Sequence, residues 1–156
     1  MARAFRRSGD RVVTRLEPYA AALLRGLVGD VVTLVRADGE DPVTRRLFPD
    51  ASPDPEIAAE LRDLLHDDLR EAKLANARAL LESLPDDGQV ELDVETAEQW
   101  LAALNDVRLA LGTALHVTAE SQEREVADDD VGMHVYDLLT FLQDSLVSAL
   151  SAGVEG

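Results

Sequence analysis

The titratable side chains that could do chemistry gather around the first of three histidines. His66 is followed directly by Asp67 and Asp68, and Asp63 and Glu71 lie within five residues of it. Carboxylate oxygens suit hard cations such as Mg²⁺ or Ca²⁺, so these residues could form a metal site along one helix face. Such runs of charge are more often a helix face exposed to water. We expect the solvated face, with neither a metal nor a cofactor.

The remaining histidines and the glycines lack the partners that a catalytic motif needs. No histidine lies three or four residues from another, which excludes a zinc-binding His-x-x-x-His face. The chain also has no glycine-rich phosphate loop and no Gly-x-Ser-x-Gly nucleophile turn. We expect His116 to be structural and His134 to be exposed at a helix start. The prediction is a protein that is not an enzyme; the alternative is an enzyme or small-ligand protein with a pocket beside Asn105, Arg108 and His116.

Polar residues interrupt a largely apolar helix that we predict from Asp93 to Val117. Its apolar side consists of Trp100, Leu101, Leu104, Val107, Leu111 and Leu115, and small residues flank it, so we expect the core helix of a bundle. Asn105, Asp106 and Arg108 must find hydrogen bonds there, because an unsatisfied buried polar group costs about 1–3 kcal/mol. They form either a structural network or a partner-binding site. Trp100, the only tryptophan, belongs either to the core or to a binding hot spot.

Arginines are concentrated at the start of the chain. Arg6, Arg7 and Arg11 are candidate partner-binding residues that could dock on an acidic protein surface, and the alternative is a solvated strand edge protected by charge. The turn chemistry of Ser8-Gly9-Asp10 is expected to disturb the strand register between Arg7 and Arg11. Direct nucleic-acid binding is not expected, because the whole chain has a net charge of −16.

The spacing of apolar residues predicts the elements that would position these side chains. Val12, Val13 and Thr14 are β-branched and favour a short strand, which the alternating segment Gln89–Asp93 could pair with. A helix begins at Pro18 and ends before Asp38, with a strand at Val31–Val35 as the competing prediction for its end. A short helical turn is predicted at Val43–Leu47.

Two further helices and one loop complete the expected pattern. Asp54 and Pro55 form a helix start, and the helix should run to about Leu84. Its expected buried stripe is Ile57, Leu61, Leu64, Leu65, Leu69 and Ala72. The charged segment Thr118–Asp130 has no stripe and is expected to be a mobile loop. The last helix should place Met133, Tyr136, Leu139, Leu142, Leu146 and Leu150 on one side.

The predicted fold is therefore mostly α. It is a single-domain helical bundle, residues 1–156, of about four main helices. A basic ribbon at residues 4–15 and the strand Gln89–Asp93 would form a small two- or three-stranded antiparallel sheet, and the acidic loop at 118–130 would connect the last two helices.

The bulk composition agrees with such a fold. Apolar residues make up 46% of the 156 residues and aromatic residues only 4%, which favours packed helices over aromatic-rich strands. The first 50 residues hold nine arginines against seven acidic groups, and the remaining residues hold six basic groups against 24 acidic ones. This acidic surface favours basic partners. We expect a cytoplasmic protein that does not bind membranes, because the start has no apolar signal core and no apolar run is long enough to span a bilayer.

Several stretches resemble a family of small actinobacterial proteins that carry a domain of unknown function. The most specific is Trp100-Leu-Ala-Ala-Leu-Asn-Asp-Val-Arg-Leu-Ala-Leu-Gly112, supported by Asp68-Leu-Arg-Glu-Ala-Lys73, by Tyr136-Asp-Leu-Leu-Thr-Phe-Leu-Gln143 and by the arginine-rich start at Arg6. The family is also that of the oxidative-stress transcriptional regulator AosR. The resemblance covers nearly the whole chain.

The resemblance implies a transcriptional regulator that acts through protein partners. The implied partner is a stress sigma factor or RNA polymerase, and the implied role is support of cysteine biosynthesis under oxidation. Redox switching by a disulfide is associated with that regulator, whereas this chain has no cysteine. An oxidant would therefore have to be sensed by another molecule. A homodimer is an open alternative among the partners.

Overall fold

The computed structural model describes residues 4–121 and 126–155, and their side chains over 4–115 and 131–152. Three strands precede or interrupt the helices: β1 (Phe5–Ser8), β2 (Arg11–Arg15) and β3 (Gln89–Asp93). The helices are α1 (Pro18–Ala37), α2 (Pro42–Leu47), α3 (Pro55–Ser83), α4 (Val94–Ser121) and α5 (Val126–Glu155). The mostly α fold with a small antiparallel sheet is confirmed. Within the described ranges no helix is both long and apolar enough to cross a bilayer.

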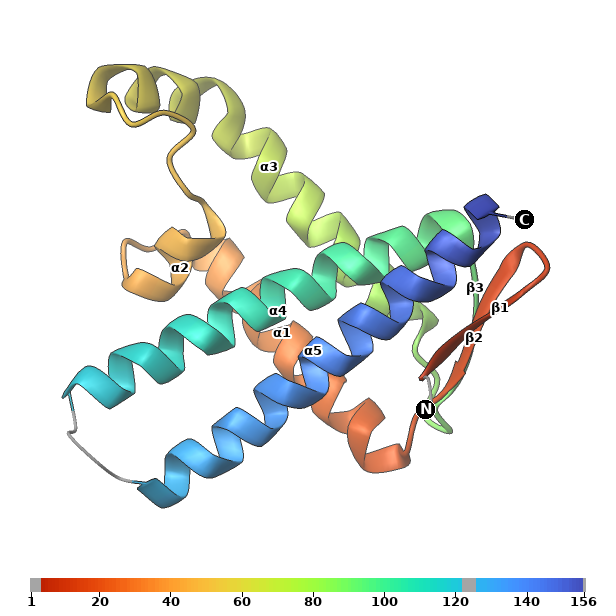
Figure 1. The fold of residues 1–156 in the computed structure, drawn as a ribbon. Coiled ribbons are helices and arrows are strands. Elements are labelled where there is room, and N and C mark those ends of the chain that lie inside the picture. Colours follow the sequence, from red (N-terminus) through yellow and green to blue (C-terminus); the bar gives the residue numbers. More distant parts are fainter. Residues whose placement is uncertain (1–3, 122–125, 156) are drawn as a thin grey trace.

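The small sheet closes one end of the bundle (Figure 1). Its strand order is β1-β2-β3, and both pairs are antiparallel. Phe5 lies opposite Thr14, and Val12 lies opposite Leu92. These side chains are buried against α4 and α5, because alternate residues of a strand point to the same face. The Phe5 ring meets Trp100 edge-on at 6.0 Å between centroids.

Helix α4 is the core helix, as predicted. It packs against α1, α2, α3, α5 and the sheet. Trp100 is fully buried, and its indole Nε1–H donates to Ser83 Oγ at 2.8 Å. Trp100 therefore belongs to the core rather than to a binding surface.

Acidic caps start several of the helices. The carboxylates of Asp41, Asp54 and Asp93 accept hydrogen bonds from the backbone N–H groups of Thr44, Glu56 and Thr96, at 2.8–3.0 Å. The backbone hydrogen bonds hold the pKa of Asp41 and of Asp93 below the usual 3.8. The starts at Asp54 and Asp93 agree with the sequence analysis.

The structure settles one open alternative and corrects two expectations for the elements. Helix α1 is continuous through Val31–Val35, so the competing strand does not form. Most of the segment expected to be a loop at Thr118–Asp130 belongs to α4 and α5, because its alanines and glutamates favour helix; residues 122–125 lie outside the described part. On α5 Leu139, Leu142 and Leu146 are buried, but Met133 is exposed.

Candidate partner-binding site

The first half of α3 carries apolar side chains that face away from the protein. This part of the helix extends beyond the bundle, and its amino-terminal end is the outermost part of the molecule in Figure 1. Leu64 is 73% exposed and Leu65 is 51% exposed. The predicted buried stripe is therefore wrong: Ile57, Leu64, Leu65, Leu69 and Ala72 are exposed and Leu61 is half-buried.

The reason is that α3 buries one side along its length, and most of these leucines lie off that side: Ala58, in the first half, is only 4% exposed. In the second half, Ala77 and Leu80 are buried against the bundle. At 100° per residue, Leu64 points about 160° away from Leu80 and about 120° away from Ala58, so a straight helix that buries Leu80 against the bundle turns Leu64 toward water. Leu64 therefore faces outward, whereas Leu61 lies between the two sides and is half-buried.

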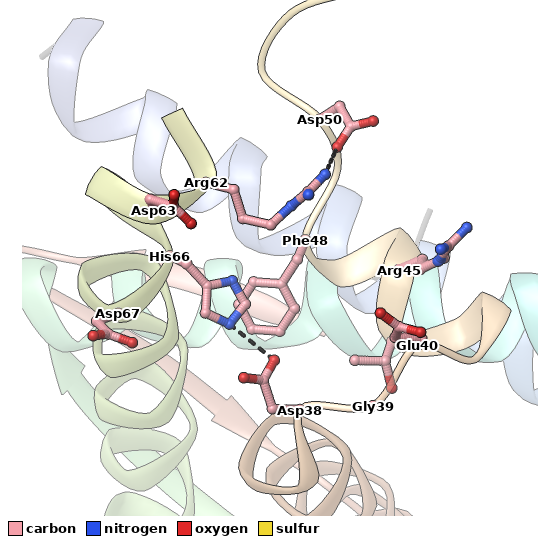
Figure 2. A pocket seen from close by; sticks show the side chains of 11 residues that line it. Asp38, Gly39, Glu40, Arg45, Phe48, Asp50, Arg62, Asp63, His66 and Asp67 are labelled. Carbon is pink, nitrogen blue, oxygen red and sulfur yellow. Dashed lines mark hydrogen bonds and ion pairs between the residues drawn. The ribbon is translucent and has the colours of Figure 1, made fainter. Parts of the chain in front are cut away.

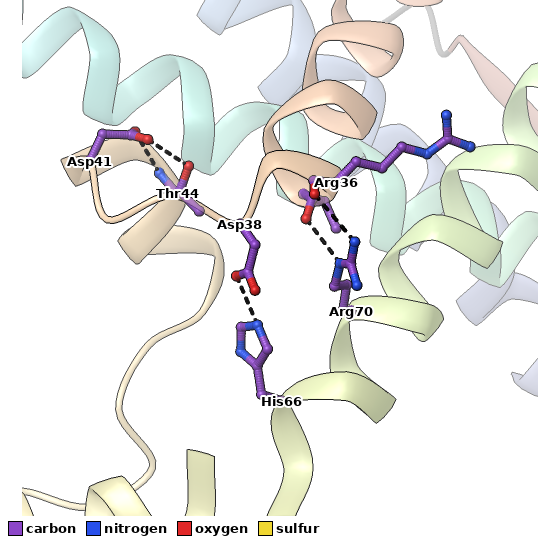
Figure 3. A network of polar contacts seen from close by, with 7 residues as sticks. Arg36, Asp38, Asp41, Thr44, His66 and Arg70 are labelled. Atoms are coloured by element: carbon purple, nitrogen blue, oxygen red, sulfur yellow. Dashed lines mark hydrogen bonds and ion pairs between the residues drawn. The ribbon is translucent and has the colours of Figure 1, made fainter. Parts of the chain in front are cut away.

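Polar contacts on the inner face attach this half of α3 to the bundle (Figure 3). A His66 ring N–H donates to Asp38 Oδ1 at 2.8 Å. The Arg70 guanidinium donates to the backbone oxygens of Val35 and Arg36, both at 3.2 Å. These are carbonyls at the end of α1, where a basic group also stabilises the helix dipole.

The residue that ends α1 has an unusual backbone. Asp38 adopts a left-handed conformation with φ 53°, and its N–H donates to Leu34 O. Aspartate tolerates this conformation better than most residues. The turn aims the Asp38 carboxylate at His66, so the same residue ends one helix and holds another.

Contacts of Phe48 and a buried ion pair connect His66 of α3 with α4. The Phe48 ring lies 4.6 Å from the His66 ring between centroids, and Lys73 Nζ lies 6.0 Å from the Phe48 centroid. Lys73 Nζ donates to Asp106 Oδ1 at 2.7 Å, and both side chains are nearly buried. Burial raises the pKa of the Asp106 carboxyl above its usual 3.8, and Lys73 opposes that rise.

A hollow of about 600 Å³ separates the inner side of α3 from α2 and the α1–α2 turn (Figure 2). Its charged lining comprises Asp38, Glu40, Asp50, Asp63, Asp67, Arg45, Arg62 and His66. Arg62 pairs with Asp50 across it. Over the described residues, no three potential ligands converge on a point that could hold a metal ion. The hollow is thus polar and mainly acidic.

The charged run around His66 divides into two kinds of residue. Asp63, Asp67, Asp68 and Glu71 are exposed, in agreement with the predicted solvated face. His66 is half-buried between Asp38 and Phe48. The neighbours of His66 in the sequence do not indicate this position, because its hydrogen-bond partner Asp38 is 28 residues away.

The polar residues of α4 do not form one site. Asp106 faces Lys73 of α3, whereas Arg108 donates to Gln143 Oε1 of α5 at 2.9 Å. The Gln143 side-chain amide in turn donates to Asn105 Oδ1 at 3.3 Å. All three residues thus have hydrogen-bond partners inside the protein, which agrees with the structural network and gives no support to a shared surface. His116 lies in α4, and its side chain is outside the described ones; His134 is exposed.

The arginines of the ribbon lie on two faces. Arg7 pairs with Val12 across the hairpin and points to the same face as that residue, and its Nε–H donates to Gly9 O at 2.8 Å. Arg11 lies opposite Asp93 and, like Arg6, is exposed. The turn at Ser8–Asp10 separates Arg7 from Arg11, as expected, so the three arginines are not one continuous patch.

Comparison of the sequence with known proteins identifies relatives and a family. A Mycobacterium leprae protein is 35% identical over 93% of this chain and 85% of its own length. Proteins of Mycobacterium bovis and Mycobacterium tuberculosis, both named oxidative stress regulator AosR, are each 32% identical over 92% of this chain and 84% of their own length. No solved structure matches the chain. The model of the domain of unknown function DUF2017 matches residues 2–150, and the chain belongs to this family.

Proposed function

We propose that this chain is a non-enzymatic regulatory protein that acts by binding another protein. The observation that carries the proposal is the outward-facing leucine surface on the first half of α3, because a contiguous exposed apolar surface on a folded protein commonly marks an interaction site. The names of the mycobacterial relatives support a regulatory role in the response to oxidative stress.

The proposed partner is a component of the transcription machinery, a sigma factor or RNA polymerase, in the cytoplasm. An acidic chain is suited to approach basic protein surfaces and repels nucleic acid. Since the chain has no cysteine, oxidation would reach it through its partner or through the amount of protein made.

Crosslinking in native cytosol tests the proposal. The tagged full-length chain is crosslinked, purified under denaturing conditions and its attached proteins are identified. The proposal predicts a sigma factor, a polymerase subunit or another single defined protein, enriched over a tagged acidic control protein. Recovery of crosslinked copies of the chain alone would contradict it.

The hollow beside α2 favours a second candidate function, the binding of a small cationic ligand. Five carboxylates and two guanidinium groups line about 600 Å³, which is within the size range of small-molecule sites. A thermal-shift screen of polyamines and other cationic metabolites tests this candidate. Stabilisation that Asp63→Asn abolishes supports it, and no stabilisation by any compound excludes it.

A further inference from the structure

We propose that the outer face of α3 binds a basic amphipathic helix of the partner. The inference rests on the proposed partner-binding role and names the chemistry of that partner. We call this surface the α3 outer face. It consists of the apolar residues Ile57, Leu61, Leu64, Leu65 and Leu69 and, along one side, the acidic residues Glu60, Asp63, Asp67 and Glu71, of which Asp63 and Asp67 also line the hollow beside α2.

The apolar residues form a continuous stripe. At 100° per residue, Leu61, Leu64 and Leu65 fall within an arc of about 100°, and Leu69 extends it toward the segment 48–51. The stripe from Ile57 to Leu69 is roughly 18 Å long, or about three helical turns. This length matches the i, i+3, i+4 and i+7 contacts by which a single helix packs against another.

One edge of the stripe continues into a small groove whose apolar residues are flanked by Asp50, Arg62 and His66. Leu65 and Leu69 of α3 lie opposite Phe48, Pro49 and Ala51, and the space between them is about 50 Å³. Such a groove accepts part of one aliphatic side chain. The groove therefore provides one concave place on the α3 outer face where a side chain of the partner helix can be buried.

The other edge is lined by carboxylates that no cation of this chain neutralises, as far as the structure describes it. Glu60, Asp63, Asp67 and Glu71 are exposed, at helical spacings of three and four. Of the arginines nearby, Arg62 pairs with Asp50 and Arg70 donates to the end of α1. Arg45 lines the same hollow as Asp63 and Asp67 but forms no ion pair with either of them in the described part of the chain. The complementary partner thus has lysines or arginines along one side of an apolar stripe.

Two other occupants fit less well. A second copy packed antiparallel about a twofold axis would place its own acidic row opposite this one, and each copy already has a net charge of −16. The chain's own arginine-rich ribbon lies on the far side of the molecule from the start of α3 (Figure 1). The charge and the position both favour a separate basic helix.

Fluorescence anisotropy with a designed peptide tests the proposal. The probe is a labelled helix of leucine and lysine, of about 18 residues because shorter helices are marginal in water. Leu64→Asp should weaken its binding to the full-length protein at least about tenfold, as expected when one buried leucine is lost. Glu60→Gln combined with Asp67→Gln should weaken it a few-fold and reduce its dependence on salt.

The matched control is Val131→Asp on α5. Val131 is 65% exposed, close to the 73% of Leu64, so the two substitutions have similar costs for folding. Circular dichroism and the melting temperature should be unchanged in both variants, and only Leu64→Asp should lose the peptide. Equal loss in both variants would overturn the proposal. So would equal binding of a peptide with the same composition in scrambled order.

Further outcomes separate this inference from the proposed function. If Leu64→Asp still captures the same protein in crosslinking as the unchanged chain, the α3 outer face is not the site, although the regulatory role stands. If the unchanged chain captures only itself, the proposed function fails. A concentration-dependent mass in light scattering that Leu64→Asp abolishes would assign the face to a second copy and overturn the basic-helix proposal.

Discussion

Lys73 and Asp106 place a charge pair where burial makes each charge costly. Lys73 is 13% exposed and Asp106 is 7% exposed, so neither group is well hydrated. Each compensates the desolvation of the other across 2.7 Å. The pair also fixes which part of α3 faces α4, because apolar contacts alone would tolerate a small shift of the helix.

Replacement of Lys73 tests the energetic role of this pair. Lys73→Met should lower the free energy of unfolding by about 3 kcal/mol, because the Asp106 carboxylate then stays buried without a counterion. The double variant Lys73→Met with Asp106→Leu should recover most of this loss, since it removes both charges. Urea unfolding followed by circular dichroism measures both values. Equal stability of Lys73→Met and the unchanged protein would contradict the ion pair.

The same variant should show a defined pH dependence. Burial already raises the pKa of Asp106, and removal of Lys73 takes away the hydrogen bond and the charge that oppose the rise. A carboxyl whose pKa is higher in the folded than in the unfolded state favours folding when protonated, so its destabilising effect grows as pH rises from about 3.8. The loss in Lys73→Met should therefore be largest at pH 8 and smaller near pH 4.5, each against the unchanged protein at that pH. An equal loss at the two pH values would show that Asp106 is not the titrating group.

At the level of elements, the sequence predicts most helix and strand boundaries correctly, but the leucine spacing indicates the wrong buried face for α3. The proline and aspartate signals at Asp54 and Asp93 are local, so they marked helix starts correctly. The face that α3 buries depends on where α3 leaves the bundle, which is a tertiary property. For that reason the leucine spacing predicts a buried stripe in its first half, although Leu64 faces water.

The candidate site was predictable to a similar degree. The acidic run at Asp63–Glu71 was recognised as solvated, but its association with exposed leucines required the direction of the helix. Asn105 and Arg108 are candidate partner-binding residues from the sequence, because a single sequence does not reveal Gln143 as their shared partner on α5. Contacts between helices distant in sequence are set by packing and are not encoded in local spacing.

The turn before β3 requires glycine at position 88, because no other residue type fits there. Gly88 has φ 74°, and a Cβ placed there would lie 2.0 Å from Leu16 O. Gly88→Ala should cost at least about 2 kcal/mol in unfolding free energy, since it combines left-handed strain with a backbone clash. Gly9→Ala is the matched control, because Gly9 has φ 63° but nothing within 4 Å of its added Cβ, and about 1 kcal/mol is expected. Equal losses in the two variants would exclude the clash.

At the scale of the whole molecule, a new charge should leave the free energy of unfolding nearly unchanged at the surface and lower it strongly in the core. Leu64→Asp should change the unfolding free energy by less than about 0.5 kcal/mol, because the side chain is already in water. Leu80→Asp, on the buried face of the same helix, should prevent stable folding. Thermal unfolding of the two variants compares them directly. Strong destabilisation by Leu64→Asp would mean that the first half of α3 packs against the bundle with its leucines.

The bundle thus has a basic surface at the ribbon and an acidic, partly apolar surface at the start of α3. The ribbon presents Arg6 and Arg11, and the start of α3 presents leucines beside a row of carboxylates. Of these two surfaces, the second combines exposed leucines with a row of carboxylates. This combination is why the account assigns partner binding to α3.

Chemical-shift mapping tests that assignment most directly. The ¹⁵N-labelled full-length protein is titrated with the leucine–lysine peptide, and amide shifts are followed in two-dimensional spectra. The account predicts that the largest changes cluster in residues 57–72 and 48–51 and disappear in Leu64→Asp. Changes centred on the ribbon at Arg6–Arg11, or spread evenly over the acidic surface, would contradict it.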